Sequence, residues 1–213
     1  MHQEHRTQLL ELARTYVPTD DNTHDFLHTL RVFKIAERLL ESEVGDPDIV
    51  LAAVAFHDLI VHPKFGEKTA DSAGDSADLA RKLLEGLEWF PQQKIPQVES
   101  AIQKCSFSRF VPKDTPEEGI VHDADLLESS GAIAIARTFA YSGTTNRPFY
   151  NELEPVPVTR TLNEKAFALD LFKQRLFKVR EKLHTNTAQQ MLARREELLQ
   201  AFYDEFLLEV EGL

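Results

Sequence analysis

Three of the eight histidines in this chain are followed directly by an aspartate, and each pair lies in a stretch with a helical pattern. Imidazole nitrogens and carboxylate oxygens are ligands that divalent metals accept, and no thiolate accompanies them here. We therefore expect helices from these three segments to meet around one metal ion. The pairs are His24-Asp25, His57-Asp58, which we place at the centre of the site, and His122-Asp123.

The spacing of the central pair sets a structural condition. Adjacent residues on a helix diverge by about 100°. His57 and Asp58 could therefore share one ion only near a helix end, where the backbone can relax. Pro63 and the loop that follows place the pair at such an end.

Spacing also limits the other two segments. His24 and His28 are four residues apart, so on a helix they lie on one face about one turn apart. Asp123 and Asp125 are two residues apart and cannot both point at one spot from a regular helix. One of these aspartates should be a ligand and the other its neighbour.

A site of two imidazoles and two carboxylates suits one divalent ion: Mn²⁺, Mg²⁺, Fe²⁺, Co²⁺, Ni²⁺ or Zn²⁺. Four protein ligands would leave positions on an octahedral ion for water and substrate. The cation would acidify that water, which could then attack phosphorus at neutral pH. A site of this kind could therefore act on a phosphorylated substrate.

The apolar pattern predicts helices that position these side chains, and no strand pattern extends beyond a few residues, so the expected fold is all-α. The stretch Asp48–Ile60 is almost continuously apolar and should be an interior helix. Residues 71–76 are small and polar, which is typical of a loop and cap. Gly131 should break an Ala-rich segment. The other helices are expected over residues 3–17, 24–42, 77–87, 96–107, 120–141, 162–184 and 187–211.

Composition excludes several classes of protein. A net charge of -11 argues against a general nucleic-acid or anionic-membrane surface. The single cysteine, Cys105, excludes an internal disulfide and suits a reducing cytosol. No basic, apolar signal peptide begins the chain, and no apolar run approaches the ~20 residues of a membrane span. We expect a cytoplasmic protein whose oligomeric state is open.

The order His28, His57-Asp58, Asp125 resembles the HD-domain superfamily of metal-dependent phosphohydrolases. His28-Thr-Leu-Arg-Val resembles its H-x-x-R-V segment. Ala-Asp125-Leu-Leu resembles its A-D-[KR]-L segment, which favours Asp125 over Asp123 as the fourth ligand. Residues 131–141, GAIAIARTFAY, are similar to a bacterial branch that carries D-A-D followed by G-A-I-G-I-A-R-T-F-A-Y.

The resemblance covers roughly residues 20 to 150. It implies that His28, His57, Asp58 and Asp125 hold the metal. It also implies a single helical HD-type domain over 1–213, with its core in 20–150 and a pair of long C-terminal helices in 160–213.

Phosphoryl transfer also needs cations and a proton donor. Lys64 could reach a bound phosphate, or be a solvated loop lysine. His62 is a candidate general acid, with a surface or packing role as the alternative. His24, one turn before His28, could hold a phosphate oxygen. Two further residues would contact the ligands rather than the ion. Asp123 would orient a ligand histidine, and Arg31 would form an ion pair with a nearby carboxylate.

We therefore expect a metal-dependent phosphohydrolase that acts on a small phosphorylated metabolite, most plausibly a nucleotide. Many nucleotide hydrolases of the superfamily carry a Glu three residues after the metal-binding Asp, and Val61 stands at that position here. This departure keeps a second hypothesis open, a non-catalytic helical module that binds a metal or a nucleotide. An oxygen-activating iron enzyme on the same scaffold is a minor alternative.

Overall fold

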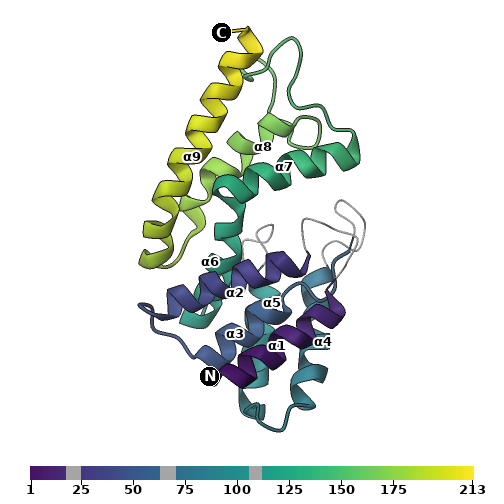
Figure 1. Ribbon diagram of the computed structural model, residues 1–213, viewed down its shortest axis with the longest axis vertical. Helices are drawn as coiled ribbons and strands as arrows, with labels where there is room; N and C mark the ends of the chain where they lie inside the picture. The colour runs from purple at the N-terminus through teal and green to yellow at the C-terminus, as the bar shows by residue number, and fades with distance from the viewer. Residues whose placement is uncertain (18–24, 63–70, 106–111) are drawn as a thin grey trace. The chain divides into compact units, whose positions relative to one another are not determined.

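The computed structural model describes residues 1–17, 25–62, 71–105 and 112–213. Within these ranges the chain is helical and has no strand, which confirms the predicted all-α fold (Figure 1). Its contacts divide it into two compact units, Met1–Leu126 and Leu127–Leu213. The division falls inside the expected core of 20–150, and the interpretation as a single HD-type domain stays a prediction.

The first unit is built around a buried helix, α3. Every residue of α3 from Ile49 to Phe56 is buried, and the helix packs against all the other α-helices of its unit. This is the interior position that its nearly continuous apolar sequence predicts. The α-helices of the unit are α1 (Gln3–Tyr16), α2 (Phe26–Leu40), α3 (Pro47–Phe56), α4 (Ser72–Glu85), α5 (Ile95–Cys105) and α6 (Pro116–Leu126).

Polar contacts fix the point where α3 begins. The carboxylate of Asp46 accepts a hydrogen bond from the backbone N–H of Asp48 at 2.9 Å, which caps the helix. Lys94 lies in the 3₁₀ turn η2 (Gln92–Lys94) before α5. Its Nζ is 2.7 Å from Asp46 Oδ2 and 2.8 Å from Asp48 Oδ2. Because the start of α3 is held in this way, the position of its other end is fixed as well.

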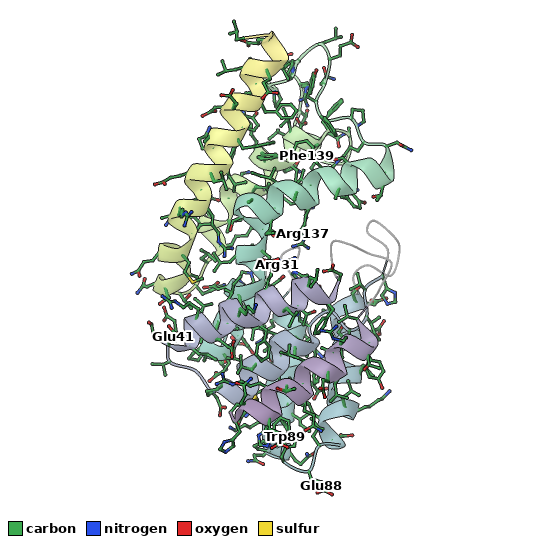
Figure 2. All side chains as sticks on the ribbon, in the orientation of Figure 1. Arg31, Glu41, Glu88, Trp89, Arg137 and Phe139 are labelled. Atoms are coloured by element: carbon green, nitrogen blue, oxygen red, sulfur yellow. The ribbon has the colours of Figure 1, made fainter. Side chains whose placement is uncertain are left out.

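The second unit has an aromatic core. Phe139 projects from α7 (Gly131–Thr145) and lies 5.8 Å, centroid to centroid, from both Phe202 and Phe206 of α9 (Asn186–Glu211) (Figure 2). Phe172 of α8 (Ala168–Gln174) is fully buried and stacks on Phe202 at 5.8 Å. Such ring pairs contribute stability beyond that gained from the apolar area each ring buries. They therefore hold α7, α8 and α9 together.

Gly131 breaks the Ala-rich segment, as predicted. It has a left-handed φ of 72° and separates the 3₁₀ turn η3 (Leu127–Ser129) from α7. This backbone conformation favours glycine. A Cβ at this position would also lie 3.2 Å from Cβ and Cγ of Arg195, whose guanidinium donates to the carbonyl of Leu127.

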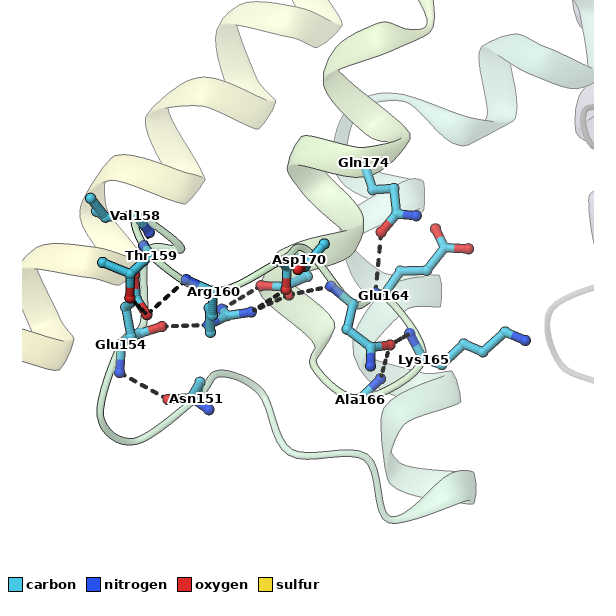
Figure 3. A network of polar contacts seen from close by, with 12 residues as sticks. Asn151, Glu154, Val158, Thr159, Arg160, Glu164, Lys165, Ala166, Asp170 and Gln174 are labelled. Carbon is cyan, nitrogen blue, oxygen red and sulfur yellow. Dashed lines mark hydrogen bonds and ion pairs between the residues drawn. The ribbon is translucent and has the colours of Figure 1, made fainter.

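Asp170 of α8 organises the segment before it (Figure 3). Its buried carboxylate accepts hydrogen bonds from Arg160 Nη1 at 2.5 Å and Nη2 at 2.7 Å. It also accepts from the backbone N–H of Asn163 at 2.7 Å. Arg160 Nε donates in turn to the carbonyl of Glu154 at 2.9 Å. One buried acid thus holds residues 154–163 against the helix.

The predicted helix over residues 162–184 is wrong. That region contains the short helix α8 and the 3₁₀ turns η4 (Leu176–Lys178) and η5 (Arg180–Lys182). Arg175 ends α8 with φ -131° and ψ -56°. The hydrogen bond from Asn163 to Asp170 turns the preceding chain back along α8. Tertiary contacts therefore override a helical pattern in the sequence.

Two further boundaries differ from expectation. Residues 71–76 are not a loop, because α4 begins at Ser72. Helix α3 ends at Phe56 rather than Ile60. Among the helices in the described ranges, none combines the length and the apolar character that a bilayer span requires.

We predict that Asp170→Asn destabilises the second unit by about 3 kcal/mol at pH 7, because it breaks a buried ion pair and leaves Arg160 uncompensated. Burial raises the pKa of Asp170, but the hydrogen bonds from Arg160 and Asn163 outweigh it, and the net pKa lies below its usual value. The carboxylate's contribution is therefore present above the unfolded pKa of about 3.9 and is lost as pH falls through the folded pKa.

Hydrogen exchange of peptides from α8, measured at pH 7 and again near pH 3, tests both the predicted loss of stability and its dependence on pH. The difference between variant and wild type should shrink at the lower pH. Asp204→Asn, at an exposed position on α9, is the matched control and should change stability by less than about 0.5 kcal/mol. Equal effects of the two substitutions would contradict the prediction.

Candidate metal centre

The end of α3 supplies two neighbouring side chains to one place. The helix stops at Phe56, and His57 is its C-cap residue. His57 Nε2 lies 3.5 Å from Asp58 Oδ2, so the two successive side chains converge as the helix end allows. His57 Nδ1 is 2.8 Å from the carbonyl of Val54. A carbonyl only accepts, so Nδ1 carries the proton and the Nε2 lone pair faces the cluster.

Helix α2 supplies the second imidazole. Asp25 caps this helix by accepting from the backbone N–H of His28 at 2.9 Å. The ring of His28 is 1% exposed. Its Nε2 lies 3.2 Å from Nε2 of His57 and 3.5 Å from Asp58 Oδ2.

Helix α6 supplies Asp125. Its Oδ1 lies 3.4 Å from His28 Nε2 and 3.7 Å from His57 Nε2. Asp123, two residues earlier, is fully buried, and its Oδ1 is 3.3 Å from Nδ1 of His122. The two aspartates of α6 therefore have different surroundings, as their spacing predicts, and Asp125 lies with the histidines.

The distances in this cluster fit a cation. Two imidazole nitrogens 3.2 Å apart require a proton or a cation between them, and the His57 nitrogen contributes a lone pair. Ligand atoms about 2.1 Å from one ion, at angles of about 90° to 109°, lie about 3.0 to 3.4 Å apart. One ligand atom from each of His28, His57 and Asp125 lies within 4.8 Å of the others. Asp58 Oδ2 is 3.5 Å from both imidazole nitrogens, so this His/Asp cluster could hold a metal ion.

Burial and charge differ across the cluster. The two histidine side chains are almost inaccessible, whereas the side chains of Asp58 and Asp125 are 23% and 25% exposed. Burial raises the pKa of Asp125, but the hydrogen bond with His28 and the charges of His57 and His28 lower it to about 2. Asp125 is therefore a carboxylate at neutral pH, and the accessible side of the cluster carries the acids.

Cys105 of α5 contacts the same carboxylate, and the sequence analysis missed this role. Its Sγ lies 3.8 Å from Asp125 Oδ2 and 3.9 Å from the carbonyl of Val121. Burial raises the pKa of this thiol well above its usual value, so the group stays protonated and can donate. Oδ1 of Asp125 faces the histidines while Oδ2 faces the thiol. The sequence carries one signal for this role of Cys105, which is its place near the C-terminal end of the helix expected over residues 96–107.

The remaining predicted site residues have different outcomes. His24 and Lys64 lie outside the described residues. Arg31 is half-buried on α2, three residues after His28, and its ion-pair role stays a prediction. His62 is described, and its Nε2 lies 2.7 Å from Oδ2 of Asp75 on α4. Asp75 lies in the stretch that had been expected to be a loop.

Comparisons with known proteins identify a family and several solved structures to which the chain is similar. Residues 25–130, which include all four residues of the cluster, match the family model for the HD domain. The Bacillus subtilis protein YpgQ, described as uncharacterized, is 26% identical over 213 residues, covering 95% of this chain and 94% of YpgQ. An HD-superfamily hydrolase from Bacillus thuringiensis has a crystal structure that covers 99% of both chains at 27% identity, with a TM-score of 0.71. A crystal structure of YpgQ in complex with ADP covers 97% of this chain and 98% of that one at 24% identity, with a TM-score of 0.72.

We predict that Mn²⁺ raises the melting temperature of the wild type and not that of His57→Ala. An ion that binds only the folded chain stabilises it by about 2.7 kcal/mol at one hundred times its Kd. Removal of the His57 ring takes away one ligand and the side chain that fixes its neighbours. Thermal unfolding with and without Mn²⁺, together with the metal content of the purified protein, measures both effects.

His5→Ala is the matched control, because the His5 ring stacks on Trp89 at 3.9 Å, away from the cluster. It should keep the full response to Mn²⁺. A His57→Ala protein that retains metal and responds like the control would show that the cluster is not the metal site.

Proposed function

Because this chain belongs to the HD-domain superfamily, we propose that it is a metal-dependent phosphohydrolase acting on a small phosphorylated metabolite, specifically a nucleotide. The observation that supports this proposal is the convergence of His28, His57, Asp58 and Asp125, with nitrogen and oxygen atoms 3.2 to 3.7 Å apart. The proposed cofactor is one divalent ion held by these four side chains.

Each ligand has a distinct contribution in this proposal. His57 is oriented by the carbonyl of Val54, so its Nε2 is available as a ligand without rotation of the ring. His28 is oriented by the capped first turn of α2. Asp58 and Asp125 offset the charge of the ion on the partly exposed side, where a substrate can approach. When bound, the ion would supply Lewis-acid chemistry and acidify water at this side.

A nucleotide is the substrate class best supported. YpgQ was crystallised in complex with ADP, and a phosphorylated ligand needs positive charge in a protein whose net charge is -11. The metal would supply that charge at the site. We assign Lys64 and His24 to contacts with phosphate oxygens, and His62 to protonation of the leaving group.

One observation favours a second candidate, a non-catalytic module that binds a metal or a nucleotide. Val61 cannot carry protons, and it stands where many nucleotide hydrolases of the superfamily have a glutamate. If the module is non-catalytic, the same cluster would bind a ligand without turnover.

The test is a hydrolysis screen over nucleoside mono-, di- and triphosphates and cyclic nucleotides, with Mn²⁺ or Mg²⁺ added after chelation. We expect turnover by the wild type that a chelator removes and Mn²⁺ restores. Asp58→Asn should lower the rate at least about 1000-fold, because loss of a ligand removes several kcal/mol of charge stabilisation in the transition state.

Asp78→Asn, at an exposed position on α4, is the matched control and should keep the wild-type rate. Turnover that persists in Asp58→Asn would defeat the assignment of the site. Nucleotide binding without turnover by the wild type, measured by calorimetry, would identify the non-catalytic module instead.

A further inference from the structure

His62, four residues after Asp58 in the chain, forms a pair with Asp75 of α4. Their side chains meet through Nε2 and Oδ2 at 2.7 Å, a short charge-assisted hydrogen bond. The His62 side chain is 24% exposed and that of Asp75 is 46% exposed. Asp75 therefore holds the ring at Nε2, while part of the ring remains accessible to solvent. We infer that Asp75 is the positioning residue that holds His62 as the proton donor for the leaving group. This inference rests on the proposed phosphohydrolase function.

The pair belongs to a set of contacts that tie the chain after Asp58 to the start of α4. The hydroxyl of Ser76 donates to the carbonyl of Ile60 at 3.1 Å and accepts from its N–H at 3.0 Å. The hydroxyl of Ser72 accepts from the backbone N–H of His62 at 3.0 Å. Backbone and ring of His62 are thus both held by one helix.

These contacts come from one face of α4. Ser72, Asp75 and Ser76 are spaced i, i+3 and i+4, which places them side by side on a helix. Ser76 is fully buried, so this face packs on the segment that follows the cluster. A surface histidine that had no function would need only solvent around its ring, whereas this one has its main chain and its ring nitrogen fixed separately.

The hydrogen bond determines which ring nitrogen can act. A carboxylate only accepts, so His62 Nε2 carries the proton in the contact with Asp75. In the charged imidazole, Nδ1 then holds the proton that can leave.

The step balances as follows. A water oxygen forms a bond to phosphorus while the bond from phosphorus to the leaving oxygen breaks, and the electron pair stays on the leaving oxygen. His62 gives its Nδ1 proton to that oxygen and becomes neutral, with Nε2–H still on Asp75. The attacking water loses one proton to solvent, and the ring regains one from solvent.

The test compares Asp75→Asn with Asp78→Asn, an exposed acid on the same helix. In Asp75→Asn we expect kcat to fall about 10- to 100-fold, as for other partners that orient a functional histidine, while KM and metal content stay near wild type. Asp75→Glu should restore part of the rate, and Asp78→Asn should match wild type.

A double-variant cycle separates positioning from folding. His62→Asn should lower kcat about 100-fold or more, and addition of Asp75→Asn to it should cause little further loss, since Asp75 acts through the ring. Independent losses in the double variant, or a kcat for Asp75→Asn equal to that of Asp78→Asn, would overturn the inference and leave the proposed function intact.

Proton NMR of the His62 ring, assigned with His62→Asn, supplies a readout that does not depend on activity. The signal of the hydrogen-bonded Nε2 proton should be present in wild type and Asp78→Asn and weakened by solvent exchange in Asp75→Asn; an unchanged signal in Asp75→Asn would overturn the pairing. A wild type that shows no turnover with any metal or nucleotide would overturn the phosphohydrolase proposal itself and the proton-donor role with it.

Discussion

The structure depends on two imidazole nitrogens that face each other at 3.2 Å inside the first unit, with two carboxylates beside them. The tautomer of His57 points a lone pair at His28, and burial removes the water that would otherwise separate the rings. Either a proton on His28 Nε2 or a cation between the rings satisfies this lone pair. An ion bound here would link metal affinity to folding stability, because it would bind the folded arrangement of these side chains and not the unfolded chain.

The fold imposes this arrangement by fixing where helices begin and end. The capped start of α3, with its Lys94 contacts, fixes the position of this helix, which ends at Phe56 immediately before His57 and Asp58. Helix α6 is held to α5 by a buried Glu118, whose carboxylate accepts from Lys104 at 2.9 Å and Ser100 at 2.7 Å. These contacts lie two turns before Asp125 and set the direction in which it projects. Ion pairs remote from the cluster thus position its ligands.

Local sequence was sufficient where a single helix or its end decides the outcome. The apolar run before His57 predicts a buried helix with the pair near its end, and the left-handed Gly131 is a local property as well. It was insufficient where distant side chains decide. The pattern of residues 162–184 is helical, but Asp170 and Arg160 fold it differently. The choice between Asp123 and Asp125 came from a family resemblance rather than from spacing.

Cys105 shows why the cluster presents only nitrogen and oxygen to an ion. A thiolate beside two imidazoles would favour softer metals. Burial keeps this sulfur protonated, and it lies 3.8 Å from Asp125 Oδ2, behind the oxygen that faces the histidines. Its single proton can be donated to Asp125 Oδ2 or to the carbonyl of Val121, so the thiol is a weak donor beside the carboxylate. It leaves Oδ1 directed at the cluster, and the donor set remains one of two imidazoles and two carboxylates, which suits an ion with open positions for a phosphorylated ligand.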